Sequence, residues 1–93
     1  MLKCISVYTR NFETFSDIYE KVLSTEWKNN EELTIDGITV SESGEVPGHY
    51  LDRMRAKPGV VVMKEKLRDI TILQHGDVFE ILVPSAAAET IMR

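Results

Sequence analysis

The stretch ELTIDGITV, residues 32–40, constrains the fold of this chain more than any other part of the sequence. An Asp-Gly pair at 36–37 favours a two-residue type I′ turn, because both central residues of that turn need a positive φ. The flanking residues mirror one another, so Ile35 would face Ile38, Thr34 would face Thr39, and Leu33 would face Val40. Four apolar side chains then share one face and the threonines the other. The stretch therefore predicts a β-hairpin.

A second hairpin is predicted over residues 69–83, DITILQHGDVFEILV. We place its turn at His75-Gly76, which sets Ile70 opposite Ile81 and Ile72 opposite Phe79. Pro84 ends the second strand, because proline cannot donate a hydrogen bond to a ladder.

The N-terminal segment predicts a strand followed by a helix. Residues 2–9 alternate with apolar groups on both faces, which indicates a strand in the interior of a sheet. Apolar residues then recur at helical spacing from about residue 12 to residue 24, with charged residues opposite. Asn11 is a suitable N-cap for this helix.

The remaining segments complete an α+β pattern. We expect a loop at 42–49, a short helix at 48–56 ended by Pro58 and Gly59, a strand at 60–64, and a C-terminal helix from Ser85. Consecutive hairpins with few crossovers predict a single α+β domain over residues 1–93. Its mostly antiparallel sheet has five or six short strands and one main covering helix. The alternative is a small, partly open barrel with an appended β-α-hairpin segment.

Composition limits the compartment and the cofactors. The chain has one cysteine and two histidines, so we expect neither an intramolecular disulfide nor a metal site, and no cofactor. No apolar run approaches the ~20 residues that span a bilayer, and the first residues lack the apolar core of a secretory signal. We therefore expect a cytoplasmic protein that does not enter a membrane.

Charge is distributed unevenly along the chain. Residues 50–68 hold six Lys or Arg against two acidic residues, a local charge of +4 within a chain of net charge −4. The acidic remainder disfavours nucleic acid, because its long-range field repels phosphate. A candidate site for a phosphorylated or carboxylated metabolite is formed by His49, Arg53, Arg55 and Lys57. The alternative is that these side chains are simply the solvated face of a short helix.

Two further groups are candidates for chemistry. His75 and Asp77 form a possible secondary polar site, although a histidine at a hairpin tip is also a suitable turn residue. Cys4 is a candidate nucleophile only if a base and partial exposure accompany it, and core packing is the alternative. An enzyme using either group requires both to share a cleft with another polar residue.

The sequence assembles no catalytic set, which leads to three functional expectations. The first is a non-catalytic regulatory or protein-interaction module that forms a homodimer through an open sheet edge or an uncovered face, or that binds another protein. The second is a sensor that binds a small anionic metabolite at the basic patch. The third is a small enzyme of unknown reaction.

Overall fold

The computed structural model of the chain describes residues 2–84. Its elements, in chain order, are β1 (Leu2–Val7), α1 (Phe12–Ser24), β2 (Glu32–Ile35), β3 (Ile38–Val46), α2 (His49–Arg55), β4 (Val61–Glu65), β5 (Ile70–His75) and β6 (Val78–Pro84). The helix expected from Ser85 lies outside the described residues.

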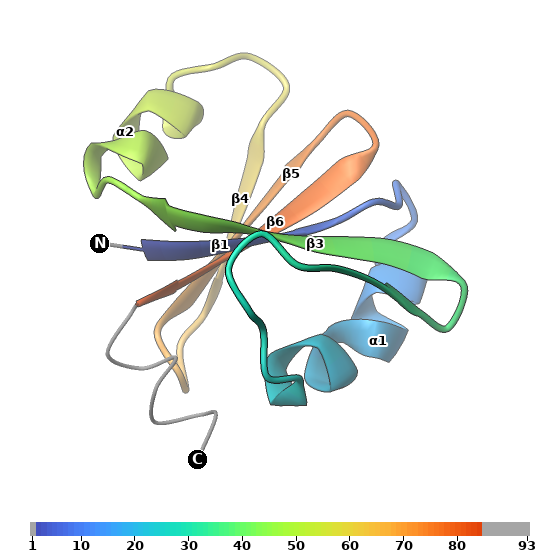
Figure 1. Cartoon of the computed structure of the whole chain (residues 1–93). Coiled ribbons are helices and arrows are strands. Elements are labelled where there is room, and N and C mark those ends of the chain that lie inside the picture. Colours follow the sequence, from blue (N-terminus) through green and yellow to red (C-terminus); the bar gives the residue numbers. More distant parts are fainter. Residues whose placement is uncertain (1, 85–93) are drawn as a thin grey trace.

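The six strands form one antiparallel sheet in the order β2-β3-β1-β6-β5-β4 (Figure 1). The sheet is open, with β2 and β4 at its two edges. The α+β prediction with a mostly antiparallel sheet and a covering helix is confirmed, and the barrel alternative is wrong. The expectation that the first strand is interior is also confirmed, because β1 lies between β3 and β6.

Helix α1 begins where the sequence predicted. The side chain of Asn11 accepts a hydrogen bond from the backbone N–H of Thr14 at 3.0 Å and so caps the helix. Four residues of the helix are buried, and they recur at helical spacing: Phe15, Ile18, Val22 and Leu23. Because these residues lie on one side of the helix, α1 packs onto one face of the sheet, which we call the α1 face.

The main core lies between α1 and the α1 face. Its buried residues are Ile5, Val7, Phe15, Ile18, Val22, Leu23, Trp27, Val40, Ile70, Ile72, Phe79, Ile81 and Val83. At its centre, the rings of Phe15 and Phe79 stack with centroids 4.3 Å apart. Trp27, which follows the C-terminal end of α1, is buried in the same core, and its indole N–H donates to the carbonyl oxygen of Val22 at 2.8 Å.

Helix α2 packs on the opposite face of the sheet, here called the α2 face (Figure 1). Its only buried residue, Met54, joins Cys4, Leu73 and Leu82 in a smaller core. The expectation of one main covering helix is confirmed in α1. The short helix expected at 48–56 is α2, and it covers the second face in part.

The two hairpins differ in how well their register follows from sequence. In the first, Ile35 pairs with Ile38, Thr34 with Thr39 and Leu33 with Val40, as predicted. In the second, Ile72 pairs with Ile81 rather than Phe79, a shift of two residues. The turn lies at Gly76-Asp77, and Gly76 takes the positive φ of 57°. Because glycine adopts this conformation without steric cost, the turn centres on it, and His75 stays in the strand.

Strand β3 is longer than predicted. Residues 42–46, expected in a loop, continue the strand because β1 pairs with them. The ladder is irregular opposite residues 3–5, and Gly44 has a positive φ of 80° there. The buried carboxylate of Glu42 accepts hydrogen bonds from the backbone N–H groups of Asn30 and Gly44 and lies 3.6 Å from the ammonium of Lys3. These contacts satisfy a charge that would otherwise oppose burial.

Candidate functional site

The basic patch lies on and just after α2, with all four of its side chains exposed. His49, Arg53 and Arg55 lie on the helix, but α2 ends at Arg55, so Lys57 follows the helix instead of extending its stripe. Among residues 2–84, no hydrogen bond or ion pair involves these four side chains. The four cations are therefore held in place by no partner within that range, and whether they bind an anion stays a prediction.

The structure separates His75 from Asp77. Asp77 is exposed and forms an ion pair with Arg10 at 2.7 Å. His75 lies at the end of β5, about one third exposed, and its Nε2 atom is 2.8 Å from a carboxylate oxygen of Glu80 on β6. The expected role of His75 as a turn residue is therefore wrong, since its side chain points across the sheet on the α2 face.

Glu80 is the centre of a polar cluster beneath α2. Its side chain is 12% exposed and accepts hydrogen bonds from the hydroxyl of Tyr50 at 2.8 and 3.0 Å. The Sγ atom of Cys4 lies 3.6 Å from the Oε2 atom of the same carboxylate. One carboxylate thus links β1, β5, β6 and α2, and it brings Cys4 and His75, the two groups of the enzyme hypothesis, to the same partner.

The electrostatics of this cluster oppose a reactive thiolate. Burial first, and the carboxylate of Glu80 second, raise the pKa of Cys4 to about 12. Burial and the hydrogen bond to Glu80 likewise raise the pKa of Tyr50 above its ordinary value. A nucleophilic cysteine needs a depressed pKa and access to substrate, whereas Cys4 is 2% exposed and held as a neutral thiol. The hydrogen bonds from Tyr50 to Glu80 nevertheless connect α2 to β6.

The two edges of the sheet differ in length and in chemistry. Strand β2 has four residues, and its outward side chains include the exposed Glu32 and Thr34. Strand β4 has five, and within the described residues it pairs only with β5. Val61 is 51% exposed and Val62 is 36% exposed. An apolar strand with a free row of backbone donors and acceptors is a template for pairing with another strand.

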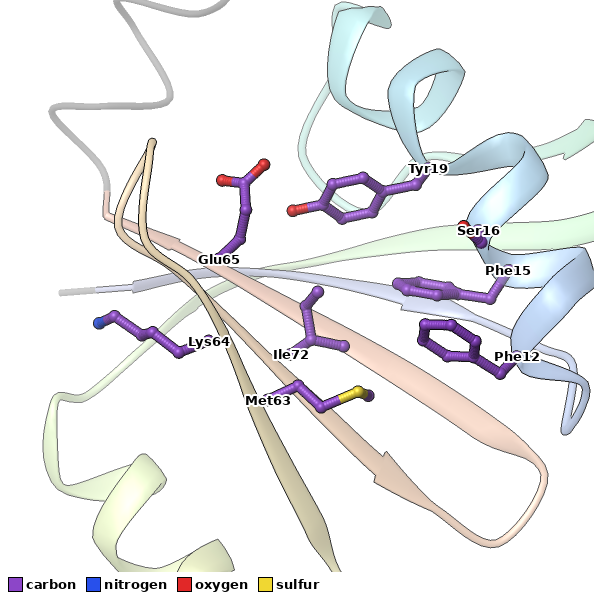
Figure 2. A pocket seen from close by; sticks show the side chains of 8 residues that line it. All are labelled: Phe12, Phe15, Ser16, Tyr19, Met63, Lys64, Glu65 and Ile72. Atoms are coloured by element: carbon purple, nitrogen blue, oxygen red, sulfur yellow. The ribbon is translucent and has the colours of Figure 1, made fainter.

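A hollow of about 260 Å³ lies beside this edge, between α1 and the strands β4 and β5 (Figure 2). Its lining is mainly apolar and comprises Phe12, Phe15, Ser16, Tyr19, Met63, Lys64, Glu65 and Ile72. Phe12 and Met63 face one another across the hollow in Figure 2, and Phe12 is 54% exposed. The free edge of β4 thus adjoins an apolar surface that is only partly covered.

Tyr19 and Glu65 form the polar end of the hollow. The buried hydroxyl of Tyr19 has no hydrogen-bond partner among the described residues, and it points towards Glu65 (Figure 2). Burial and the nearby Glu65 carboxylate raise the pKa of Tyr19 above its ordinary value.

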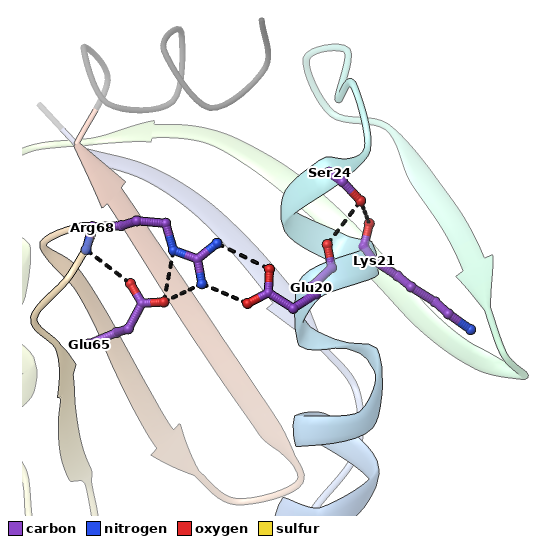
Figure 3. A network of polar contacts seen from close by, with 5 residues as sticks. All are labelled: Glu20, Lys21, Ser24, Glu65 and Arg68. Atoms are coloured by element: carbon purple, nitrogen blue, oxygen red, sulfur yellow. Dashed lines mark hydrogen bonds and ion pairs between the residues drawn. The ribbon is translucent and has the colours of Figure 1, made fainter.

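Arg68, in the turn after β4, ties this end of the strand to α1 (Figure 3). Its guanidinium donates to Glu20 of α1 at 2.8 and 3.1 Å and also to Glu65 of β4. These two carboxylates raise the pKa of Arg68, and the hydrogen bonds from Arg68 lower the pKa of Glu20. The guanidinium also lies over the ring of Tyr19, 5.6 Å from its centroid.

Comparison with known proteins gives no match: no family model, curated protein or solved structure corresponds to the chain. Within residues 2–84, no helix has the length and apolar character needed to cross a membrane, and no group of three or more potential metal ligands occurs. Inferences about function therefore rest on the geometry of the chain itself.

Sequence reasoning missed Glu80 and Tyr50 as members of one cluster. No local pattern placed α2 over β6, where the hydroxyl of Tyr50 reaches Glu80. The edge position of β4 was also missed, since strand order does not follow from local pattern. Its run of valines was visible in the sequence, however, and pointed to an apolar strand.

Proposed function

We propose that the chain is a non-catalytic protein-interaction module that associates with a second copy of itself through the outer edge of β4. The observation that carries the proposal is the apolar edge of β4, where Val61 and Val62 are exposed beside a partly covered hollow. Addition of a strand to such an edge pairs its free backbone groups and removes apolar side chains from water.

The contrast with β2 supports the choice of edge. Natural sheets protect their edges with short strands and charged or polar side chains, and β2 follows that pattern with Glu32 and Thr34. Strand β4 carries its charges only at its C-terminal end, in Lys64 and Glu65. The N-terminal half of β4 is therefore the part suited to pairing.

The other two functional hypotheses have less support from the geometry. The cations of the proposed anion sensor are exposed, and α2 has only seven residues. The proposed enzyme needs a reactive group, whereas burial beside Glu80 keeps Cys4 protonated. The proposal also includes a regulatory role and a cytoplasmic location. The single, unpaired Cys4 supports the location, since reduced thiols are typical of that compartment.

Sedimentation velocity over a range of protein concentrations tests the proposal. We expect a dimer for the native chain and a dissociation constant at least tenfold higher, about 1.4 kcal/mol, for Val61→Lys, because the change places a charge in the paired edge. Thr34→Lys is the matched control, since it places the same side chain on the exposed face of the opposite edge strand, and it should leave the dimer intact.

Unfolding by urea shows whether both variants retain the native stability, so that a loss of association is not a loss of folding. A monomeric mass for the native chain at concentrations up to the millimolar range would refute the proposal. Equal weakening by the two lysine variants would refute the assignment to β4.

A further inference from the structure

We infer that the two copies pair antiparallel about a two-fold axis that passes through Val62, and that Val61 of each copy closes the hollow of the other. This inference rests on the self-association proposed above and specifies its register. It also gives the hollow a defined occupant, namely a second copy of this chain.

The direction of the axis follows from the sheet. A two-fold axis perpendicular to the sheet makes two copies of β4 antiparallel neighbours and keeps the α1 faces of both copies on the same side. In that arrangement the residue on the axis lies opposite its own copy, and each residue at a given distance before the axis pairs with the one equally far after it. Only one residue of β4 can hold this position.

Charge excludes an axis through Lys64 or Met63, and the hollow distinguishes Val62 from Val61, because an axis through Val61 pairs Val61 with its own copy and leaves no residue of β4 opposite Met63. An axis through Lys64 places the two lysines directly opposite each other, and one through Met63 makes them diagonal neighbours; like charges so placed are destabilising. An axis through Val62 moves the two lysines four residues apart along the ladder. It pairs Val62 with its own copy on the α2 face and Val61 with the partner's Met63 on the α1 face.

The hollow fits this register. Val61 and Met63 point to the α1 face, because they pair with Gln74 and Ile72 of β5. Met63 is the wall of the hollow nearest the edge. The partner's Val61, directly opposite Met63, adds the next apolar group outward and covers that wall. The two most exposed valines of the strand, at 51% and 36%, are thereby both withdrawn from water.

Cysteine scanning of β4 reads the register directly. Val61→Cys, Val62→Cys, Met63→Cys and Lys64→Cys are made singly, oxidised with copper–phenanthroline, and compared for covalent dimer on a non-reducing gel. A disulfide needs Cα atoms within ~7 Å. A residue next to the axis is displaced from the same residue of the other copy by about 7 Å along the strand, and by the distance between the strands as well. Only the residue on the axis therefore meets the requirement. Native chain is the control, since its single cysteine is buried.

We expect Val62→Cys to form covalent dimer at least tenfold faster than the other three variants. Faster cross-linking at Val61→Cys, Met63→Cys or Lys64→Cys overturns the Val62 register while leaving self-association at β4 intact. A non-covalent dimer that cross-links at none of the four positions overturns pairing through β4. A monomer in sedimentation with no cross-linking overturns this inference and the proposed function together.

Discussion

The two faces of the sheet differ in the kinds of side chain that they bury. The core between α1 and its face of the sheet contains thirteen buried apolar side chains. The core between α2, a helix of seven residues, and the other face contains four, one of them the thiol of Cys4, and a carboxylate, a phenol and an imidazole lie beside it. The same strands form both faces, because alternate side chains of each strand point in opposite directions.

This difference indicates which interactions hold each helix. Apolar burial dominates folding stability and does not depend on pH. Hydrogen bonds to a charged group are worth about 1.5–3 kcal/mol each and depend on the protonation of both partners. We therefore expect α1 to be held by packing and α2 to be held largely by the contact between Tyr50 and Glu80.

The largest effect is expected at the centre of the α1 face. Phe79→Ala removes a fully buried ring that stacks on Phe15 and should lower the free energy of unfolding by about 3–5 kcal/mol, measured by urea denaturation. Phe12→Ala is the matched control, because Phe12 is 54% exposed, and it should cost about 1 kcal/mol or less. Similar losses for both variants would contradict the packing described for this face.

The same chemical change should have different effects on the two faces. Tyr50→Phe removes the donor to Glu80 and should cost about 1–2 kcal/mol of unfolding free energy. Tyr19→Phe removes a buried hydroxyl that has no hydrogen-bond partner among the described residues, so its effect should lie within about 0.5 kcal/mol of zero or be stabilising. Urea denaturation of the two variants measures the difference, and equal losses would show that the polar cluster does not hold α2.

A smaller effect is expected from alkaline pH, to which Cys4 on the α2 face makes a separable contribution. The pKa of Cys4 is raised in the folded chain to about 12 from an ordinary value of 9.0, so its contribution to stability is complete below pH 9 and is lost as the pH rises towards 12. Between pH 8 and pH 10 this contribution alone should fall by about 1 kcal/mol. Cys4→Ala should not show this part of the loss, and identical pH profiles for the two proteins would contradict the raised pKa.

Local sequence signals predicted much of the fold. The Asp36-Gly37 turn fixed the first hairpin and its register, because few conformations suit that pair and the flanking residues match on both sides. Asn11 and the apolar spacing after it placed both ends of α1. In the second hairpin the glycine was seen, but the turn was placed one residue too early. The faces were still assigned correctly, since a shift of two residues preserves the alternation of side chains.

The candidate site was much less predictable, because it depends on neighbours that are distant in sequence. Glu80 meets Tyr50 across 30 positions and Cys4 across 76, and no local pattern encodes such contacts. The extension of β3 was missed for the same reason, since β1 stabilises residues that alone resemble a loop. The cations of the basic patch were identified as residues, but the end of α2 at Arg55, before Lys57, became evident only in three dimensions.

Arg68 has a mechanical consequence for the rim of the sheet. Its guanidinium binds Glu65 at the end of β4 and Glu20 of α1, and so connects the β4–β5 turn to the helix. The side chain of Glu20 is largely exposed. Bonds of this kind weaken as added salt screens them. The stiffness of β4 is therefore set partly by the ionic strength of the medium. Added salt should thus affect the edge of β4 even though the exposed side chains of that edge, Val61 and Val62, are apolar.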